Sequence, residues 1–72
     1  MKEFDLKVFA DRLKELRLDK SWTHFQLAVK AGCQPGAISK WEKGERIPMG
    51  DNLFKLAQTF SCTTDYLLGL ED

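Results

Sequence analysis

The stretch from Thr23 to Arg46 constrains the fold most, because a glycine and a proline divide it into two short helical segments. Thr23 can cap a helix with its hydroxyl, and the side chain of Gln26 can accept from the backbone N–H of that capping residue. Gly32 ends the first segment where a left-handed backbone is favoured. Pro35 suits the first turn of a second helix. The stretch therefore predicts two short helices joined by a tight turn.

Apolar residues at helical spacing indicate which faces of these two helices point inward. Leu27 and Ala28 share one face of the first helix, and Ala28 is small enough to let the two helices approach each other closely. Ile38 and Trp41, three positions apart, share one face of the second helix. The opposite face of the second helix is then left outside, with Pro35, Gly36, Ser39, Lys40 and Lys43.

A helix is also predicted before this pair, over residues 5–19. Phe9, Leu13 and Leu16 form an apolar stripe at helical spacing. Arg17 adjoins that stripe, which sets it apart from the other charged residues of the segment. The residues expected on the solvated face are Asp11, Arg12 and Lys14.

Two more helices are predicted after the pair, and no segment shows the alternation of a strand. One is expected over about residues 50–60, and a short one between Thr63, as its cap, and Gly69, as its terminator. The predicted fold is all-α: one compact five-helix domain over residues 1–72, with a helix-turn-helix formed by helices 2 and 3.

Charge is distributed unevenly along the chain, although the net charge is zero. Residues 20–46 carry five basic and two acidic side chains, a balance of +3. Residues 47–72 carry one basic and four acidic side chains, a balance of −3. The positive excess on the two short helices suits contact with phosphate. We therefore expect the second helix of the pair to be presented to DNA.

Other classes of function have no support in the residues. Cys33, Cys62 and the single histidine lack the spacing of a metal or redox site, and both cysteines are expected to be small buried hydrophobes. No nucleophile–base pair or phosphate loop is present, so we expect neither an enzyme nor a cofactor or small-molecule ligand. No signal peptide or transmembrane run is found, which predicts a cytoplasmic protein that does not bind membranes.

Five collinear motifs resemble those of one family. They are RLKELR at residues 12–17, the block Thr23–Gly32, AISKWEKGERIP at residues 37–48, NLFKLA at residues 52–57 and DYLLG at residues 65–69. Together they cover most of the chain and resemble the helix-turn-helix family of phage lambda-type repressors and Cro proteins, which are xenobiotic-response-element-like transcriptional regulators. The resemblance implies a lambda-repressor-like fold and a DNA-binding function.

The resemblance also implies roles for individual residues. Arg17 and Glu42 match a buried ion pair between the first helix and the end of the third; the alternative is two solvated side chains. His24 stands where the family usually has a glutamine that binds a phosphate; the alternative is an exposed neutral histidine. The residues implied in DNA binding are His24, Gln34, Pro35, Gly36, Ser39, Lys40, Lys43 and Arg46.

Two of these positions depart from the family's pattern. Pro35 and Gly36 have no side-chain donor or acceptor, so they cannot make the bidentate base contacts of direct readout. Lys40 can reach guanine acceptors or a phosphate, and Ser39 tolerates several bases. We therefore expect modest direct readout, with DNA shape adding to specificity.

The leading hypothesis is a sequence-specific DNA-binding transcriptional regulator, expected to be a repressor. It would place helix 3 in the major groove of a double-stranded operator as a two-fold homodimer. A second hypothesis keeps the fold but gives it a protein partner, as an antitoxin-like or antirepressor-like interaction module. The zero net charge and the Pro35–Gly36 pair motivate this alternative.

Overall fold

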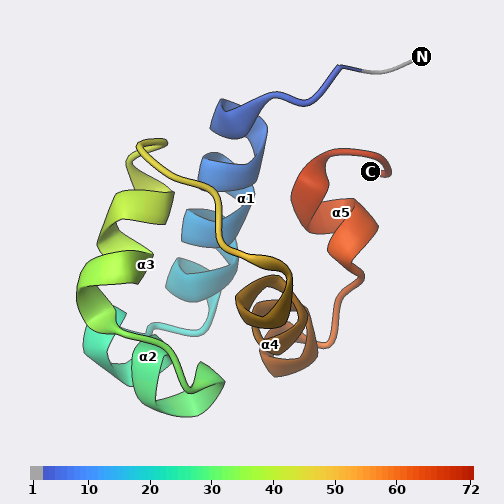
Figure 1. Ribbon diagram of the computed structural model, residues 1–72. Coiled ribbons are helices and arrows are strands. Elements are labelled where there is room, and N and C mark those ends of the chain that lie inside the picture. Colours follow the sequence, from blue (N-terminus) through green and yellow to red (C-terminus); the bar gives the residue numbers. More distant parts are fainter. Residues whose placement is uncertain (1–2) are drawn as a thin grey trace.

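The computed structural model describes residues 3–72, and within that range it consists of five helices without a strand (Figure 1). They are α1 (Leu6–Asp19), α2 (His24–Ala31), α3 (Pro35–Glu42), α4 (Gly50–Phe60) and α5 (Thr64–Leu68). The predicted all-α, five-helix fold is confirmed. The first two residues of the predicted 1–72 domain lie outside the described residues. Among the described helices, none combines the length and the apolar character that a membrane crossing needs.

Local hydrogen bonds set the ends of α2. The Thr23 hydroxyl accepts from the backbone N–H of Gln26 at 3.0 Å, and the Gln26 side chain accepts from the backbone N–H of Thr23 at 2.9 Å. Gly32 ends the helix in the left-handed conformation, with φ +73°. Pro35 opens α3, where Gln34 occupies the cap position without a side-chain cap hydrogen bond. The predicted capping box and turn are thus both present.

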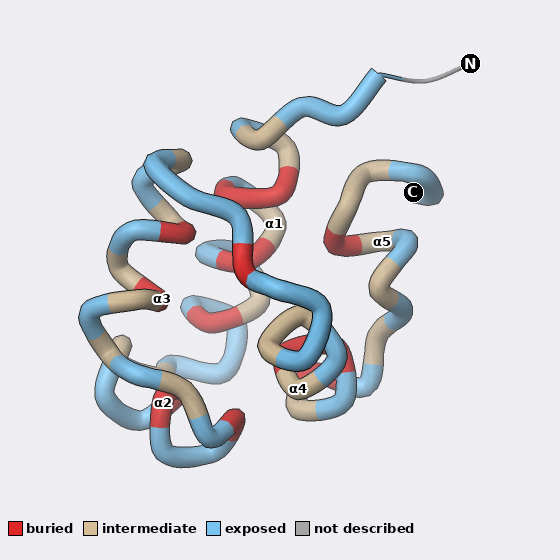
Figure 2. The backbone as a smooth tube through the Cα atoms, viewed as in Figure 1, coloured by how far each residue is buried: buried red, intermediate tan, exposed pale blue. Residues whose placement is uncertain are grey.

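The core lies where α1 meets the other helices. α1 packs against both α3 and α5, while α2 packs against α3 and α4. In Figure 2 the buried segments of the helices face this shared interior. The largest fully buried side chains are Phe9, Leu13, Leu27, Ile38, Leu56 and Leu67. Trp22 adds a partly buried ring that stacks on Phe60, with 5.6 Å between ring centroids.

The expectation that Arg12 is solvated was wrong. Its guanidinium donates to the backbone carbonyls of Tyr66 and Glu71, the latter at 2.6 Å. The same group lies 4.3 Å from the centroid of the Tyr66 ring. The periodicity of α1 predicts its inward stripe, but it does not show that α5 and the chain after it pack across the neighbouring face. Arg12 therefore fastens the end of the chain to α1.

The two cysteines are free and partly buried, and burial raises the pKa of both thiols. The Cys33 thiol lies 3.6 Å from the side-chain oxygen of Asn52, which is in the first turn of α4. Both cysteines pack against the core cluster. This agrees with the prediction of small hydrophobes, although neither is fully buried. Within residues 3–72 no group of three or more His, Cys, Asp or Glu side chains is placed to hold a metal ion.

Candidate nucleic-acid interface

α3 buries one face and presents the other at the edge of the molecule (Figure 1). Ile38 and Trp41 are buried against the core, as predicted. Gly36 and Lys40 are exposed, and Ser39 is half-buried. The capped start of α2 and the left-handed turn at its end fix the angle at which α2 supports α3. The fold thereby holds one polar face of an eight-residue helix open to a partner.

A hollow of about 420 Å³ lies on one side of this exposed face, between α3 and the segment that leads into α4. Three of the predicted DNA-binding residues line it: Gly36, Lys40 and Arg46. Lys40 and Arg46 give this hollow two cations. Ile47 and Met49, both exposed, add apolar surface to its wall.

A smaller hollow of about 190 Å³ lies where α1, α2 and α3 meet. Three other predicted DNA-binding residues line it: His24, Ser39 and Lys43. Lys14 and Arg17 enter it from α1. Six of the eight predicted DNA-binding residues therefore divide between two cationic hollows, one on each side of α3.

An ion-pair cluster forms the floor of the smaller hollow. Arg17 Nε lies 2.7 Å from Glu42 Oε2, and Arg17 Nη2 lies 2.9 Å from Glu42 Oε1. The Arg17 side chain is 10% exposed and that of Glu42 is 5% exposed. Arg17 also donates to the backbone carbonyl of Trp22 at 2.8 Å. The structure thus contains the ion pair that the resemblance implied and excludes the solvated alternative for both residues.

His24 joins this cluster. Its Nε2 lies 3.1 Å from Glu42 Oε1, and its side chain is 41% exposed. The sequence suggested two alternatives for His24, a phosphate-binding residue or an exposed neutral histidine. Neither alternative included this contact with Glu42. A carboxylate that accepts from two cationic or polar partners is well stabilised in its charged form.

The environment of Glu42 is reflected in its acidity. Burial raises the pKa of the Glu42 carboxyl, but hydrogen bonds from Arg17 and His24 outweigh burial. The net result is a pKa below the ordinary value of 4.5. Glu42 therefore stays ionised at neutral pH and neutralises part of the positive charge beneath the hollow.

Two predicted site residues, Gln34 and Pro35, line neither hollow and lie at the leading end of α3. Several residues outside the predicted site also border the hollows, among them Lys14, Ile47, Met49 and Asn52. A signal for Lys14 was present, because it precedes Arg17 by three positions and so shares its helical face. Once Arg17 is paired with α3, the same face carries Lys14 toward α3 as well.

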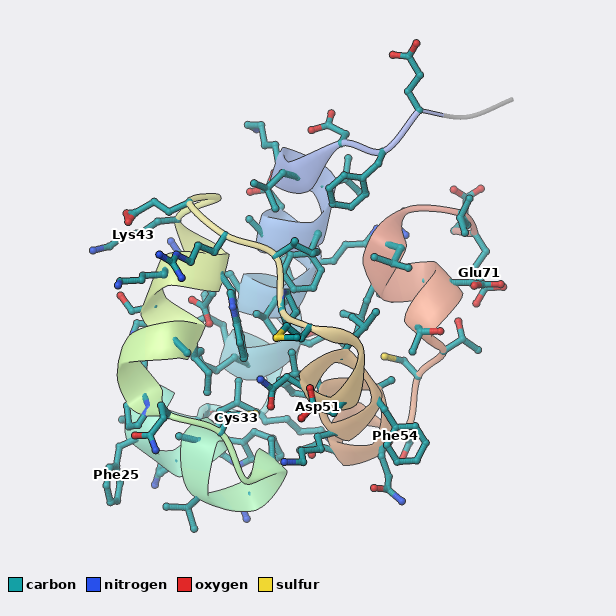
Figure 3. All side chains as sticks on the ribbon, viewed as in Figure 1. Phe25, Cys33, Lys43, Asp51, Phe54 and Glu71 are labelled. Carbon is teal, nitrogen blue, oxygen red and sulfur yellow. The ribbon has the colours of Figure 1, made fainter. Side chains whose placement is uncertain are left out.

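The acidic end of the chain lies away from these hollows. α3 and α5 both pack against α1, and Figure 1 shows them on opposite sides of it. Figure 3 shows Lys43, which follows α3, and Glu71, which follows α5, on opposite sides of the molecule. The cationic end of α3 and the acidic end of the chain are thus separated in space.

Comparisons with known proteins agree with this arrangement. A helix-turn-helix family model matches residues 13–67. The chain is 39% identical over 64 residues to the HTH-type transcriptional activator BcrR of Enterococcus faecalis, an alignment that covers 89% of this chain and 31% of that protein. It is 36% identical over 61 residues to the HTH-type transcriptional regulator ImmR of Bacillus subtilis strain 168, which covers 85% and 48% of the two chains. The chain thus spans less than half the length of either relative.

One solved structure is similar to this chain over nearly the whole length of both chains. It is the crystal structure of the c2 repressor protein of phage P22 in complex with a synthetic operator. The TM-score is 0.83 at 32% sequence identity, and the match covers 88% of this chain and 96% of that one.

Proposed function

The chain belongs to the helix-turn-helix family, and from this membership we propose that it is a sequence-specific DNA-binding transcriptional regulator. It places α3 in the major groove of an operator, with residues of the two flanking hollows on the phosphate backbone. The observation that supports this most directly is the position of α3. It has a buried apolar face, an open polar face and a cationic hollow on each side. The fold it shares with an operator-bound repressor supports the same assignment.

The contacts divide by chemistry. Lys40 and Ser39 are the side chains of α3 that can reach base edges. His24, Lys43 and Arg46 flank α3 and serve as phosphate contacts that position it. Pro35 and Gly36 at the leading end allow close approach of the backbone, but they offer little base discrimination. Gln34, which precedes them, carries a side-chain amide that can hydrogen-bond a base edge or a phosphate. Specificity then depends partly on DNA shape.

Two copies of the chain bind as a two-fold homodimer. Their recognition helices then lie about 34–36 Å apart and occupy successive major grooves. The cytoplasm, where bacterial DNA is found, is the place of action that this function requires. Among the relatives named above, one is called an activator, whereas the structural match is a repressor. Repression remains our proposal for this chain, because an operator-bound regulator blocks access to DNA without any further contact.

The direct test is selection of binding sites from random duplexes, followed by titration of the selected duplex at several salt concentrations. We expect paired half-sites one helical turn apart and a log–log salt slope that becomes shallower when cationic contacts are removed. Lys40→Ala should weaken binding and relax the base preference, whereas Lys43→Ala should lower the slope by about one per protomer. Lys55→Ala, which removes a charge from α4 instead, is the matched control. Failure to enrich any duplex, together with a flat salt response, would exclude the proposal.

The protein-interaction alternative has no comparable support. The zero net charge that motivated it is an average over residues 20–46, with a balance of +3, and residues 47–72, with a balance of −3. Both curated relatives named above are called transcriptional regulators or activators.

A further inference from the structure

The smaller hollow contains more positive than negative charge, and part of that charge has no partner in the protein. Its charged and titratable members come from every element around it: Lys14 and Arg17 from α1, His24 from α2, Glu42 from α3, and Lys43 directly after α3. Among the described residues, ion pairs are made by Lys7, Arg17 and His24. None includes Lys14 or Lys43, so these two ammonium groups remain available to an anion.

The single acidic member of the hollow is already fully engaged. Arg17 donates to both carboxylate oxygens of Glu42, and His24 shares one of them. Because the side chain of Glu42 is only 5% exposed, it cannot turn outward to repel an incoming anion. The hollow therefore presents cations at its rim and keeps its carboxylate beneath them.

His24 can occupy two charge states in this position. A carboxylate oxygen only accepts, so the Nε2 that faces Glu42 carries a proton in both states. In the neutral imidazole the other ring nitrogen is an acceptor, which an anion avoids. In the imidazolium that nitrogen becomes a second donor, while the contact with Glu42 is kept. His24 is the single histidine of the chain, so it is the one imidazole that can change the charge of the hollow.

We propose that this hollow binds a phosphate of the DNA backbone through Lys14, Lys43 and His24, and that protonation of His24 strengthens DNA binding. The proposal rests on the proposed function, because the phosphate belongs to the duplex whose groove α3 enters. It adds Lys14 as a binding residue and makes the affinity for the operator dependent on pH.

Charge counting gives the size of the effect. With a neutral imidazole the hollow carries three cations and one anion, and protonation adds a fourth cation. One further cationic phosphate contact steepens the log–log salt dependence by about 0.9 per protomer. At about 0.1 M salt this corresponds to roughly eightfold tighter binding per protomer.

The test compares wild type with His24→Gln on one selected duplex at about pH 5.5 and pH 7.5, over a range of salt concentrations. Glutamine keeps a donor toward Glu42 but cannot take up a proton. We expect wild type to bind roughly five- to tenfold more tightly per protomer at the lower pH, with the steeper slope. His24→Gln should have the same affinity and slope at both pH values. Far-UV circular dichroism at each pH checks that both proteins stay folded.

Lys14 is tested separately. Lys14→Gln should lower the salt slope by about one per protomer at both pH values without changing the preferred sequence. Lys55→Gln, the same change on α4, should leave the slope nearly unaltered. If neither pH nor Lys14 affects duplex binding beyond these controls, the present proposal is overturned while the proposed function stands. If wild type binds no duplex at either pH, the proposed function fails as well.

Discussion

Arg17 and Glu42, 25 positions apart in the sequence, form a two-point ion pair that joins α1 to the end of α3. Both side chains are nearly buried, so each charged group has lost most of its contact with water and is bound by the other instead. Such pairs contribute less to stability than their geometry suggests, because both charges must be desolvated. Their main effect is on orientation: Arg17 also binds the carbonyl before Thr23, so one guanidinium connects α1, the start of α2 and α3.

We predict that Glu42→Ala destabilises the fold strongly, because it leaves the guanidinium of Arg17 buried without its carboxylate. The expected loss is about 3–5 kcal/mol of unfolding free energy. Replacing both partners, Arg17→Met with Glu42→Leu, should cost much less, since no charge is then stranded. Urea unfolding followed by circular dichroism measures both variants. Equal losses in the single and the double variant would argue against a stranded charge as the cause.

A second prediction concerns acid. The Glu42 carboxyl has a pKa below its ordinary value of 4.5 in the folded protein. The unfolded chain therefore binds a proton more readily, and stability falls as pH falls from about 4.5 through the folded-state pKa. Above that window the contribution of Glu42 is complete. The urea midpoint of wild type should drop as pH is lowered from 5 toward 3, and the drop should be smaller in Glu42→Gln. Parallel curves for the two proteins would assign the acid sensitivity to other carboxyls.

A third prediction separates two glycines of the helix-turn-helix. Gly32 adopts a φ of +73°, where an L side chain is strained, although an added Cβ would meet no atom within 4 Å. Gly36 lies inside α3 with ordinary helical backbone and equally free space. Gly32→Ala should therefore cost roughly 1 kcal/mol, whereas Gly36→Ala should stabilise by about 0.5–1 kcal/mol.

Thermal and urea unfolding of the two alanine variants provide the measurement. Because the two changes add the same methyl group within the same motif, they control for each other. We expect the changes in unfolding free energy of the two variants to have opposite signs. Changes of the same sign would show that the backbone conformation of the glycine does not decide the effect.

The sequence predicts the helices well because their signals are local. The start and end of α2 and the start of α3 are each specified by residues that lie close to them in the sequence. These residues are Thr23 with Gln26, Gly32 and Pro35. The apolar spacing then identifies the buried faces, as it did for Ile38 and Trp41.

Contacts between helices were harder to predict. The pairing of His24 with Glu42 and the entry of Lys14 into the same hollow depend on the distance and rotation between α1, α2 and α3. Helical periodicity shows which residues share a face, but not which partner lies opposite. Arg12 was misassigned for this reason, because its partners are 54 and 59 positions away, in α5 and the segment after it.

The last prediction concerns Arg12, whose guanidinium binds the carbonyls of Tyr66 and Glu71 and covers the Tyr66 ring. α5 is only five residues long, and it lacks the length to be stable without such tertiary contacts. Arg12→Ala should cost about 1–3 kcal/mol, because hydrogen bonds to a charged donor are lost at a half-buried site. It should also speed hydrogen exchange at the Leu70 amide, which bonds the carbonyl of Asp65 at 2.8 Å.

Lys7→Ala is the control for Arg12→Ala, since it removes a cation from the same helix at an exposed pair with Asp11. Such a pair contributes little to stability, so exchange at Leu70 should remain as in wild type. The hydrogen-exchange rates of the α2 amides should also stay at their wild-type values in Arg12→Ala, because α5 packs mainly against α1 and α4. Uniform acceleration across all five helices would instead mean that Arg12 stabilises the whole domain and not the end of the chain.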